Sequence, residues 1–155
     1  MANPSPYRSL PAEKRIALVS HIIKSGKEGR MVMVQRMMSR GGFRAQTLLQ
    51  WPAEKLAGEI VRMKAESSQD ELDLLHLLYV ELEPGIQSTF LDAAGVKHEN
   101  GKMADDLPTP YTDAGGVARG AAAVKEKYGE DGLRYLRTLA RYASDGWPGI
   151  GEASS

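Results

Sequence analysis

The segment between residues 69 and 83 constrains the fold of this 155-residue chain more than any other. Ser68 and Glu71 precede and open it at the spacing of a capping box, in which a hydroxyl and a carboxylate satisfy free backbone N–H groups at a helix start. Pro84 ends it, because proline cannot continue the hydrogen-bond ladder. Its apolar residues are Leu72, Leu74, Leu75, Leu77, Leu78, Tyr79, Val80 and Leu82. Since a helix that is apolar on nearly all sides is usually buried, we expect the other elements to pack around it.

Helical periodicity recurs in the rest of the chain, whereas strand signals are nearly missing. Apolar residues repeat at i, i+3 and i+7 in several segments, and Pro11 and Pro52 stand where helices prefer to begin. No alternating run of apolar and polar residues is bounded by turn residues, as a strand would be. A chain of this length fits one ordinary domain. We therefore predict an all-α fold, a single compact domain of six to seven short helices.

The irregular segments divide the chain into a lead, a helical domain and a tail. Residues 1–9 contain two prolines and are expected to be a flexible lead, and residues 145–155 a C-terminal tail. The helical domain between them covers residues 10–144. Within it, residues 95–112 combine prolines, glycines and charges, which predicts a long irregular loop. Loops of this length in compact domains are often functional or mobile.

Composition excludes several classes of chemistry. The chain has no cysteine, so disulfides, thiolate metal sites and cysteine nucleophiles are excluded. The first ten residues lack the basic and apolar regions of a secretory signal. No apolar stretch is long enough to cross a bilayer. We therefore expect a soluble, cytoplasmic protein that has no membrane partner.

The charges are segregated although the net charge is zero. Residues 1–64 carry twelve Lys or Arg against four acids, a net +8, and residues 65–115 carry two lysines against eleven acids, a net −9. One interpretation is a basic surface that contacts phosphates. The other is that the two regions neutralise each other within the fold. Zero net charge favours the second, because nucleic-acid-binding domains are usually basic overall.

Four of the seven methionines fall in the helix predicted at residues 28–39. Met31 and Met38 share a face with Val34, which predicts that they are buried. Met33 and Met37 lie partly around the helix from that face, which predicts exposure. Because methionine is flexible and polarisable, exposed methionines suit adaptable contacts with a partner.

Arginines accompany these methionines. Arg36 and Arg40 share a helix face at i, i+4, and Arg44 follows just beyond the helix. The resulting functional prediction is a non-enzymatic interaction or regulatory module that binds a protein partner, or another copy of itself, through a Met/Arg-rich face. The predicted partner-binding residues are Met33, Arg36, Met37, Arg40 and Arg44.

Nucleic-acid binding by the basic first half is the first alternative. A helix-turn-helix could run from the helix at 28–39 to a short helical segment at 44–50, although that segment is short for a recognition helix. A second basic stripe consists of Arg134, Arg137 and Arg141 at i, i+3 and i+7. Guanidinium groups so spaced could bind phosphate oxygens in pairs.

A small-molecule or metal-dependent enzyme is the second alternative, with the acidic loop at 95–113 as its site. His98 and Glu99 in that loop could bind a cation or exchange protons. Asp73 and His76 stand at i, i+3, the spacing of half a carboxylate-bridged metal site, but no second copy is present. A polar surface loop and an isolated histidine are the more common explanations, and we expect no cofactor and no catalytic set.

Overall fold

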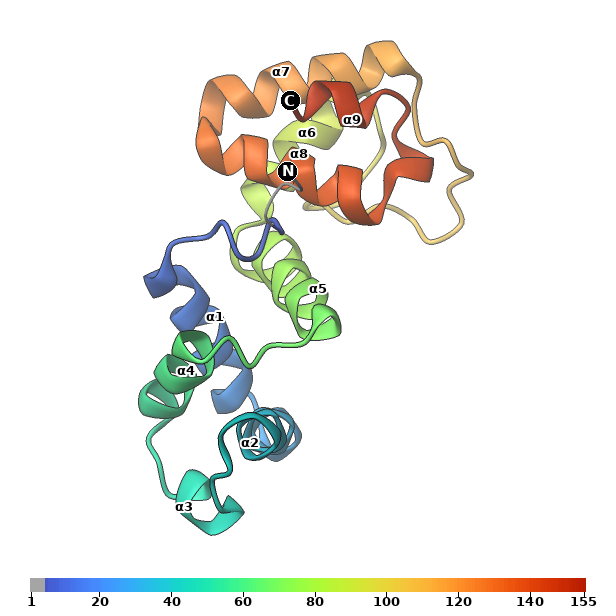
Figure 1. Ribbon diagram of the computed structural model, residues 1–155. Helices are drawn as coiled ribbons and strands as arrows, with labels where there is room; N and C mark the ends of the chain where they lie inside the picture. The colour runs from blue at the N-terminus through green and yellow to red at the C-terminus, as the bar shows by residue number, and fades with distance from the viewer. Residues whose placement is uncertain (1–4) are drawn as a thin grey trace. The chain divides into compact units, whose positions relative to one another are not determined.

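The structure is a computed structural model that describes residues 5–155. The predicted all-α fold is confirmed, since the described residues form helices and the only β pairing among them is an isolated bridge between Glu99 and Lys102 (Figure 1). Contacts divide the chain into two compact units. We call Tyr7–Leu74 the N-terminal unit, and Leu75–Ser155 together with Ser5 and Pro6 the C-terminal unit.

The N-terminal unit contains four complete helices and the first part of a fifth. They are α1 (Ala12–Lys24), α2 (Lys27–Gly41), α3 (Ala45–Leu49), α4 (Ala53–Arg62) and α5 (Ser68–His76). Pro11 and Pro52 directly precede α1 and α4, as expected for proline at a helix start. Helix α1 packs against α2 and α4, and α2 also packs against α3 and α4. This packing buries Leu18, Val19, Ile23, Val34, Leu48, Leu56 and Ile60.

The C-terminal unit continues the α5 helix and adds three longer helices. Its elements are η1 (Leu77–Leu82), α6 (Pro84–Ala94), α7 (Ala114–Tyr128), α8 (Glu130–Tyr142), η2 (Ser144–Gly146) and α9 (Ile150–Ala153). Helix α7 lies between α6 and α8 in its contacts, and α9 packs on α7 and α8. Gly120 permits the close approach of α7 to α6, because a Cβ there would lie 2.7 Å from the Phe90 ring.

Aromatic rings form the core of the C-terminal unit. Tyr79 contacts Tyr135, which contacts Phe90, and these edge-to-face pairs have centroids 5.1 and 5.7 Å apart. Phe90 and Tyr111 each lie 5.0 Å from the Trp147 ring. Edge-to-face pairs are favourable beyond the area that they bury. The series therefore joins η1, α6, α8, the loop before α7 and the chain end through one set of rings.

The helix predicted at 69–83 forms, but differently from the prediction. Ser67 and Asp70 make the capping box: Ser67 N donates to Asp70 Oδ2 at 2.9 Å and Asp70 N donates to Ser67 Oγ at 3.1 Å. The predicted pair of Ser68 and Glu71 is wrong by one residue. Two consecutive serines are each followed three residues later by an acid, so spacing alone could not choose between the pairs.

The second half of this helix is π-helical, and Glu83 N donates to Leu78 O at 2.7 Å. Leu74 and Leu75 are buried, but Leu82 is 43% exposed, so the helix is not covered on all sides as expected. The division between the two units falls between Leu74 and Leu75. One half of the predicted central helix therefore belongs to each unit.

Both chain ends are more ordered than predicted. Part of the expected flexible lead, residues 1–4, lies outside the described residues, but Tyr7 is fully buried and Leu10 nearly so. The expected tail contains η2 and α9, and Trp147 and Ile150 are buried. The described chain has nine α-helices instead of six to seven, because the short α3 and α9 add to the longer ones. None of the helices within residues 5–155 has the length and hydrophobicity required to cross a membrane.

Candidate interaction surface on helix α2

Helix α2 is oriented opposite to the prediction. Met33 and Met37 are 3% and 0% exposed, whereas Met31 and Met38 are each 41% exposed. The expectation that Met33 and Met37 form a surface while Met31 and Met38 fill the core is therefore wrong. Methionines flank Val34 on both sides of the helix, so the sequence pattern fits either orientation. The contacts of α2 with α1 and α4 select the side that carries Met33 and Met37.

The exposed side of α2 combines apolar and basic residues. Lys27, Met31 and Met38 lie within about 40° of one another around the helix axis, at 3.6 residues per turn. Val32, 39% exposed, lies about 100° further round than Met31, and Arg40, near the helix end, lies about 180° from Met31. We call Lys27, Met31, Val32, Met38 and Arg40 the α2 surface. The exposed polar residues between them are Glu28, Gln35 and Ser39.

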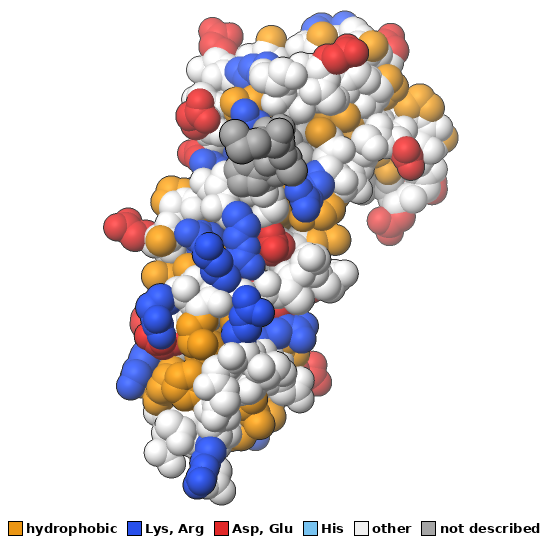
Figure 2. All heavy atoms as spheres, in the orientation of Figure 1, with side chains coloured by type: hydrophobic (Ala, Val, Ile, Leu, Met, Phe, Trp, Pro, Cys, Tyr) orange, Lys and Arg blue, Asp and Glu red, His pale blue; other side chains and the backbone are white. Residues whose placement is uncertain are grey.

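Lys and Arg side chains gather over the N-terminal unit on the face drawn in Figure 2, with hydrophobic side chains exposed among them. This unit carries twelve Lys or Arg and eight Asp or Glu, a net +4. Arg40 and Arg44 are exposed and form no ion pair with any described residue. The α2 surface is therefore an amphipathic helix side in a basic field.

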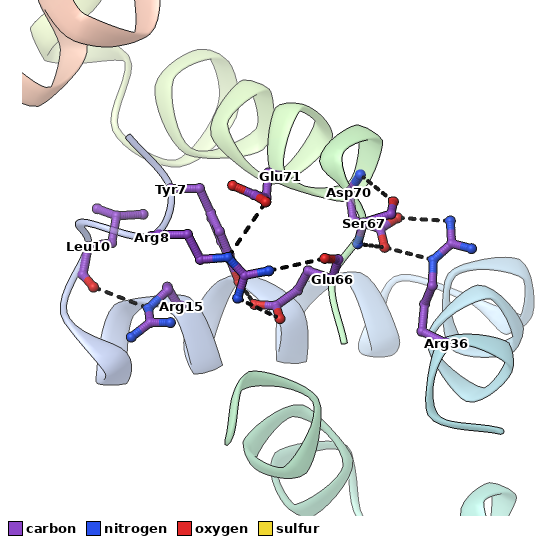
Figure 3. A network of polar contacts seen from close by, with 9 residues as sticks. All are labelled: Tyr7, Arg8, Leu10, Arg15, Arg36, Glu66, Ser67, Asp70 and Glu71. Atoms are coloured by element: carbon purple, nitrogen blue, oxygen red, sulfur yellow. Dashed lines mark hydrogen bonds and ion pairs between the residues drawn. The ribbon is translucent and has the colours of Figure 1, made fainter. Parts of the chain in front are cut away.

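Arg36, a predicted partner-binding residue, is used inside the unit instead. Its Nε and Nη2 donate to the two carboxylate oxygens of Asp70 at 2.7 and 3.2 Å (Figure 3). Burial alone would raise the pKa of Asp70, but hydrogen bonds from Arg36 and Ser67 outweigh it and hold that pKa below its ordinary value. Asp70 thus caps α5 and anchors α2 to it at the same time.

A second buried carboxylate, Glu66, lies just before α5. Tyr7 Oη donates to Glu66 Oε2 at 2.5 Å, and Arg8 donates to Glu66 Oε1 at 3.2 Å and to its backbone oxygen at 3.1 Å (Figure 3). Arg8 Nε also lies 3.5 Å from Glu71. Burial raises the pKa of Tyr7, and the hydrogen bond to Glu66 raises it further. Because both oxygens of Glu66 have donors from the same chain, the cluster fastens residues 7 and 8 and does not offer a free reactive group.

The loop at 95–113 is irregular, as predicted, but its histidine is fully engaged. His98 Nε2 lies 2.5 Å from Asp92 Oδ1, and its Nδ1 accepts from Gly101 N at 2.9 Å. Gln87 also donates to the Gly101 carbonyl. These bonds hold a tight Asn100–Gly101 turn, in which both residues have positive φ, against α6. The Asn-Gly dipeptide was a usable signal for this turn.

The other predicted metal ligands are not brought together. Asp73 and His76 are exposed on α5, and Asp73 accepts from Gln69 at 2.9 Å. Glu99 is exposed at the loop turn. Across the part of the chain that the structure describes, no three His, Asp or Glu side chains are grouped so that they could hold a metal ion. A cavity of about 700 Å³ lies beside the loop, lined by Lys97, His98, Glu99, Lys102, Met103 and Leu107.

The elements of the nucleic-acid hypothesis are also dispersed. Helix α3, the would-be recognition helix, has five residues, which is little more than one turn. In the second basic stripe, Arg134 pairs with Asp131 at 2.7 Å. Arg137 and Arg141 line a cavity beside α9 that does not include Arg134. The structure thus separates one member of the predicted stripe from the other two.

Comparison with known proteins leaves these surfaces as the only guide to function. No protein-family model, no curated protein and no solved structure matches this chain.

Proposed function

We propose that the N-terminal unit is a protein-interaction module that binds an acidic, amphipathic helix of a partner protein through the α2 surface. The observation that carries the proposal is the division of the α2 methionines into a buried pair and an exposed pair. Met33 and Met37 satisfy the core, so Met31 and Met38 are not needed for packing within the unit. Exposed methionines adapt their shape to apolar side chains of a partner.

The charge of the surroundings supports an acidic occupant. Lys27 lies on the same side of α2 as Met31 and Met38, and Arg40 and Arg44 lie at and just after the end of the helix. A helix with leucines on one face and glutamates beside them would bury its leucines against Met31 and Met38 and place its carboxylates near Lys27. This is helix-to-helix recognition of the kind in which apolar anchors recur at i, i+3 or i+4 and i+7.

Nucleic acid is the less supported occupant. The five-residue α3 is too short to fill a major groove, and the exposed side of α2 carries Glu28 and apolar residues where phosphate contacts would require basic side chains. Catalysis is not supported by any group around α2, since its exposed side carries no histidine and its arginine nearest a carboxylate is held by that carboxylate.

The test is fluorescence anisotropy with a labelled synthetic helical peptide of leucine and glutamate at helical spacing, and with a scrambled peptide of the same composition. We expect saturable binding of the helical peptide only. The double variant Met31→Ser/Met38→Ser should weaken it at least about tenfold, since burial of each large apolar side chain is worth about 1.5–3 kcal/mol. The matched control, Leu82→Ser/Tyr142→Ser, removes two exposed apolar side chains of the C-terminal unit and should leave binding unchanged.

Three results would overturn the proposal. The first is equal binding of the scrambled peptide, and the second is equal loss in both double variants. The third is that the α2 surface binds something other than a peptide. This would appear as tight binding of duplex DNA or RNA at physiological salt without peptide binding. It would also appear as self-association in sedimentation velocity that Met31→Ser/Met38→Ser abolishes. Far-UV circular dichroism checks that both variants keep their helix content.

A further inference from the structure

The cavity beside α8 and α9 points to a second binding site in the other unit. It has a volume of about 490 Å³, which lies within the range of small-molecule sites. Helix α8 contributes Arg137, Ala140 and Arg141 to its lining. The chain end contributes Gly151, Ser154 and Ser155, and Pro6 completes the lining. We propose that this cavity binds the phosphate group of a small, soluble phosphomonoester.

The two arginines are placed for one anion. They stand at i, i+4 on α8, so their side chains leave the helix on the same face. Neither forms an ion pair with a residue in the described range, whereas Arg134 on the preceding turn is paired with Asp131. Guanidinium groups bind phosphate oxygens through paired, charge-assisted hydrogen bonds. The structure thus places two guanidinium groups without a carboxylate partner at the wall of one cavity, and that of Arg141 also lies over the Tyr142 ring, 5.8 Å from its centroid.

The serines supply a neutral donor to the lining of the same cavity. Ser154 Oγ and Ser155 Oγ both donate to the Gly151 carbonyl, at 2.9 and 3.3 Å. The longer bond is the weaker one, so the Ser155 hydroxyl can turn toward a phosphate oxygen while Ser154 keeps the carbonyl satisfied. The half-buried Ala140 offers apolar surface for the organic part of the ester.

The net negative charge of the C-terminal unit favours a small ligand with one phosphate over a polyanionic ligand. Leu75–Ser155 carries eight Lys or Arg and twelve Asp or Glu, a net −4. Such a field repels a polyanion such as nucleic acid or an anionic membrane. A single phosphate between two guanidinium groups is neutralised locally. A phosphomonoester can also come from a lipid headgroup, and the experiment distinguishes that source from the soluble one.

The experiment titrates ¹⁵N-labelled full-length protein with phenyl phosphate at constant ionic strength and follows amide chemical shifts. We expect saturable shifts at residues 137–141 and 151–155. Arg137→Gln/Arg141→Gln should weaken binding at least about tenfold, since each lost hydrogen bond joins two charged groups. The control Lys125→Gln/Lys127→Gln removes the same charge from α7 and should change binding less than about twofold, because it acts only through the screened field.

Several outcomes would overturn the assignment. One is an absence of saturable shifts, and another is equal weakening by both double variants. Equal binding of phenol would show that the phosphate is not recognised, and tighter binding to phosphatidic acid vesicles than to phenyl phosphate would assign the site to a lipid. Met31→Ser/Met38→Ser should leave phenyl phosphate binding intact, so failure here and failure of the α2 proposal are distinguishable.

Discussion

In the N-terminal unit, buried charged groups fasten the segment before α1 to the start of α5, whereas in the C-terminal unit aromatic rings fasten the long loop and the chain end. Glu66 and Asp70 each accept hydrogen bonds from a side chain that is distant in sequence. Trp147 contacts the rings of Phe90 and Tyr111, and Tyr111 N donates to the neighbouring Gly146 O at 3.0 Å. The comparison separates two ways of closing a small helical unit: the first includes Asp70, whose pKa is lowered in the folded state, and the second uses uncharged aromatic rings.

The largest effect is expected from Trp147→Ala. It removes the ring that joins α6 to the loop before α7, and truncating a buried aromatic side chain costs about 3–5 kcal/mol. Urea unfolding followed by circular dichroism measures the loss. The exposed Tyr142 on α8 provides the control, because Tyr142→Ala should change stability by less than about 0.5 kcal/mol. Equal losses in the two variants would contradict the aromatic core described for this unit.

The next largest effect tests the apolar part of the N-terminal unit. Met37→Ala should cost about 2–5 kcal/mol because Met37 is fully buried, whereas Met38→Ala, one position further on, should cost less than about 0.5 kcal/mol. The same urea titration checks both variants. A larger loss of stability for Met38→Ala than for Met37→Ala would show that the sequence prediction was right and that Met38 is the buried residue.

Glu66→Ala tests the buried charges directly. It leaves the Tyr7 hydroxyl without its acceptor and Arg8 with one carboxylate partner fewer, and we expect a loss of about 2 kcal/mol. Amide hydrogen exchange locates the effect, which should concentrate at residues 7–10 and at the start of α5. Glu13→Ala, an exposed acid on α1, is the control. Uniform exchange changes across the chain would argue against a local fastening role for Glu66.

The smallest effect is that of Asp70→Asn, about 1 kcal/mol at pH 7 from the weakened cap and the lost charge. Because the pKa of Asp70 is lowered in the folded state, its contribution is present above the unfolded value near pH 4 and disappears as pH falls through the folded pKa. The stability difference between the two proteins should therefore stay constant from pH 7 to about pH 4 and shrink as the pH falls further.

The two tryptophans make this pH test specific to one unit. Trp51 lies in the N-terminal unit and Trp147 in the C-terminal unit, so 5-fluorotryptophan labelling gives each unit its own ¹⁹F NMR signal. Acid should broaden or shift the Trp51 signal at a higher pH than the Trp147 signal. The reverse order would show that the ionic contacts of the N-terminal unit are not its acid-sensitive part.

Local signals in the sequence predicted local structure well. Proline at the start of α1 and α4 depends on a few neighbouring residues, and both helices begin where expected. The predictions were wrong where two neighbouring sequence patterns fitted the same helix start equally well. Ser67 with Asp70 and Ser68 with Glu71 are both capping boxes by spacing, and Glu71 lies instead against Arg8, a residue distant in sequence.

The candidate site was predictable only in its location. The sequence determined that helices form, that α2 is rich in methionine and arginine, and that α8 carries an arginine stripe, because these follow from composition and helical periodicity. Tertiary structure decided which methionines are exposed, that Arg36 is committed to Asp70, and that Arg137 and Arg141 share a cavity without Arg134. The reason is physical: periodicity fixes which residues share a face, but only the packing of neighbouring helices determines which face is buried and which charges find partners.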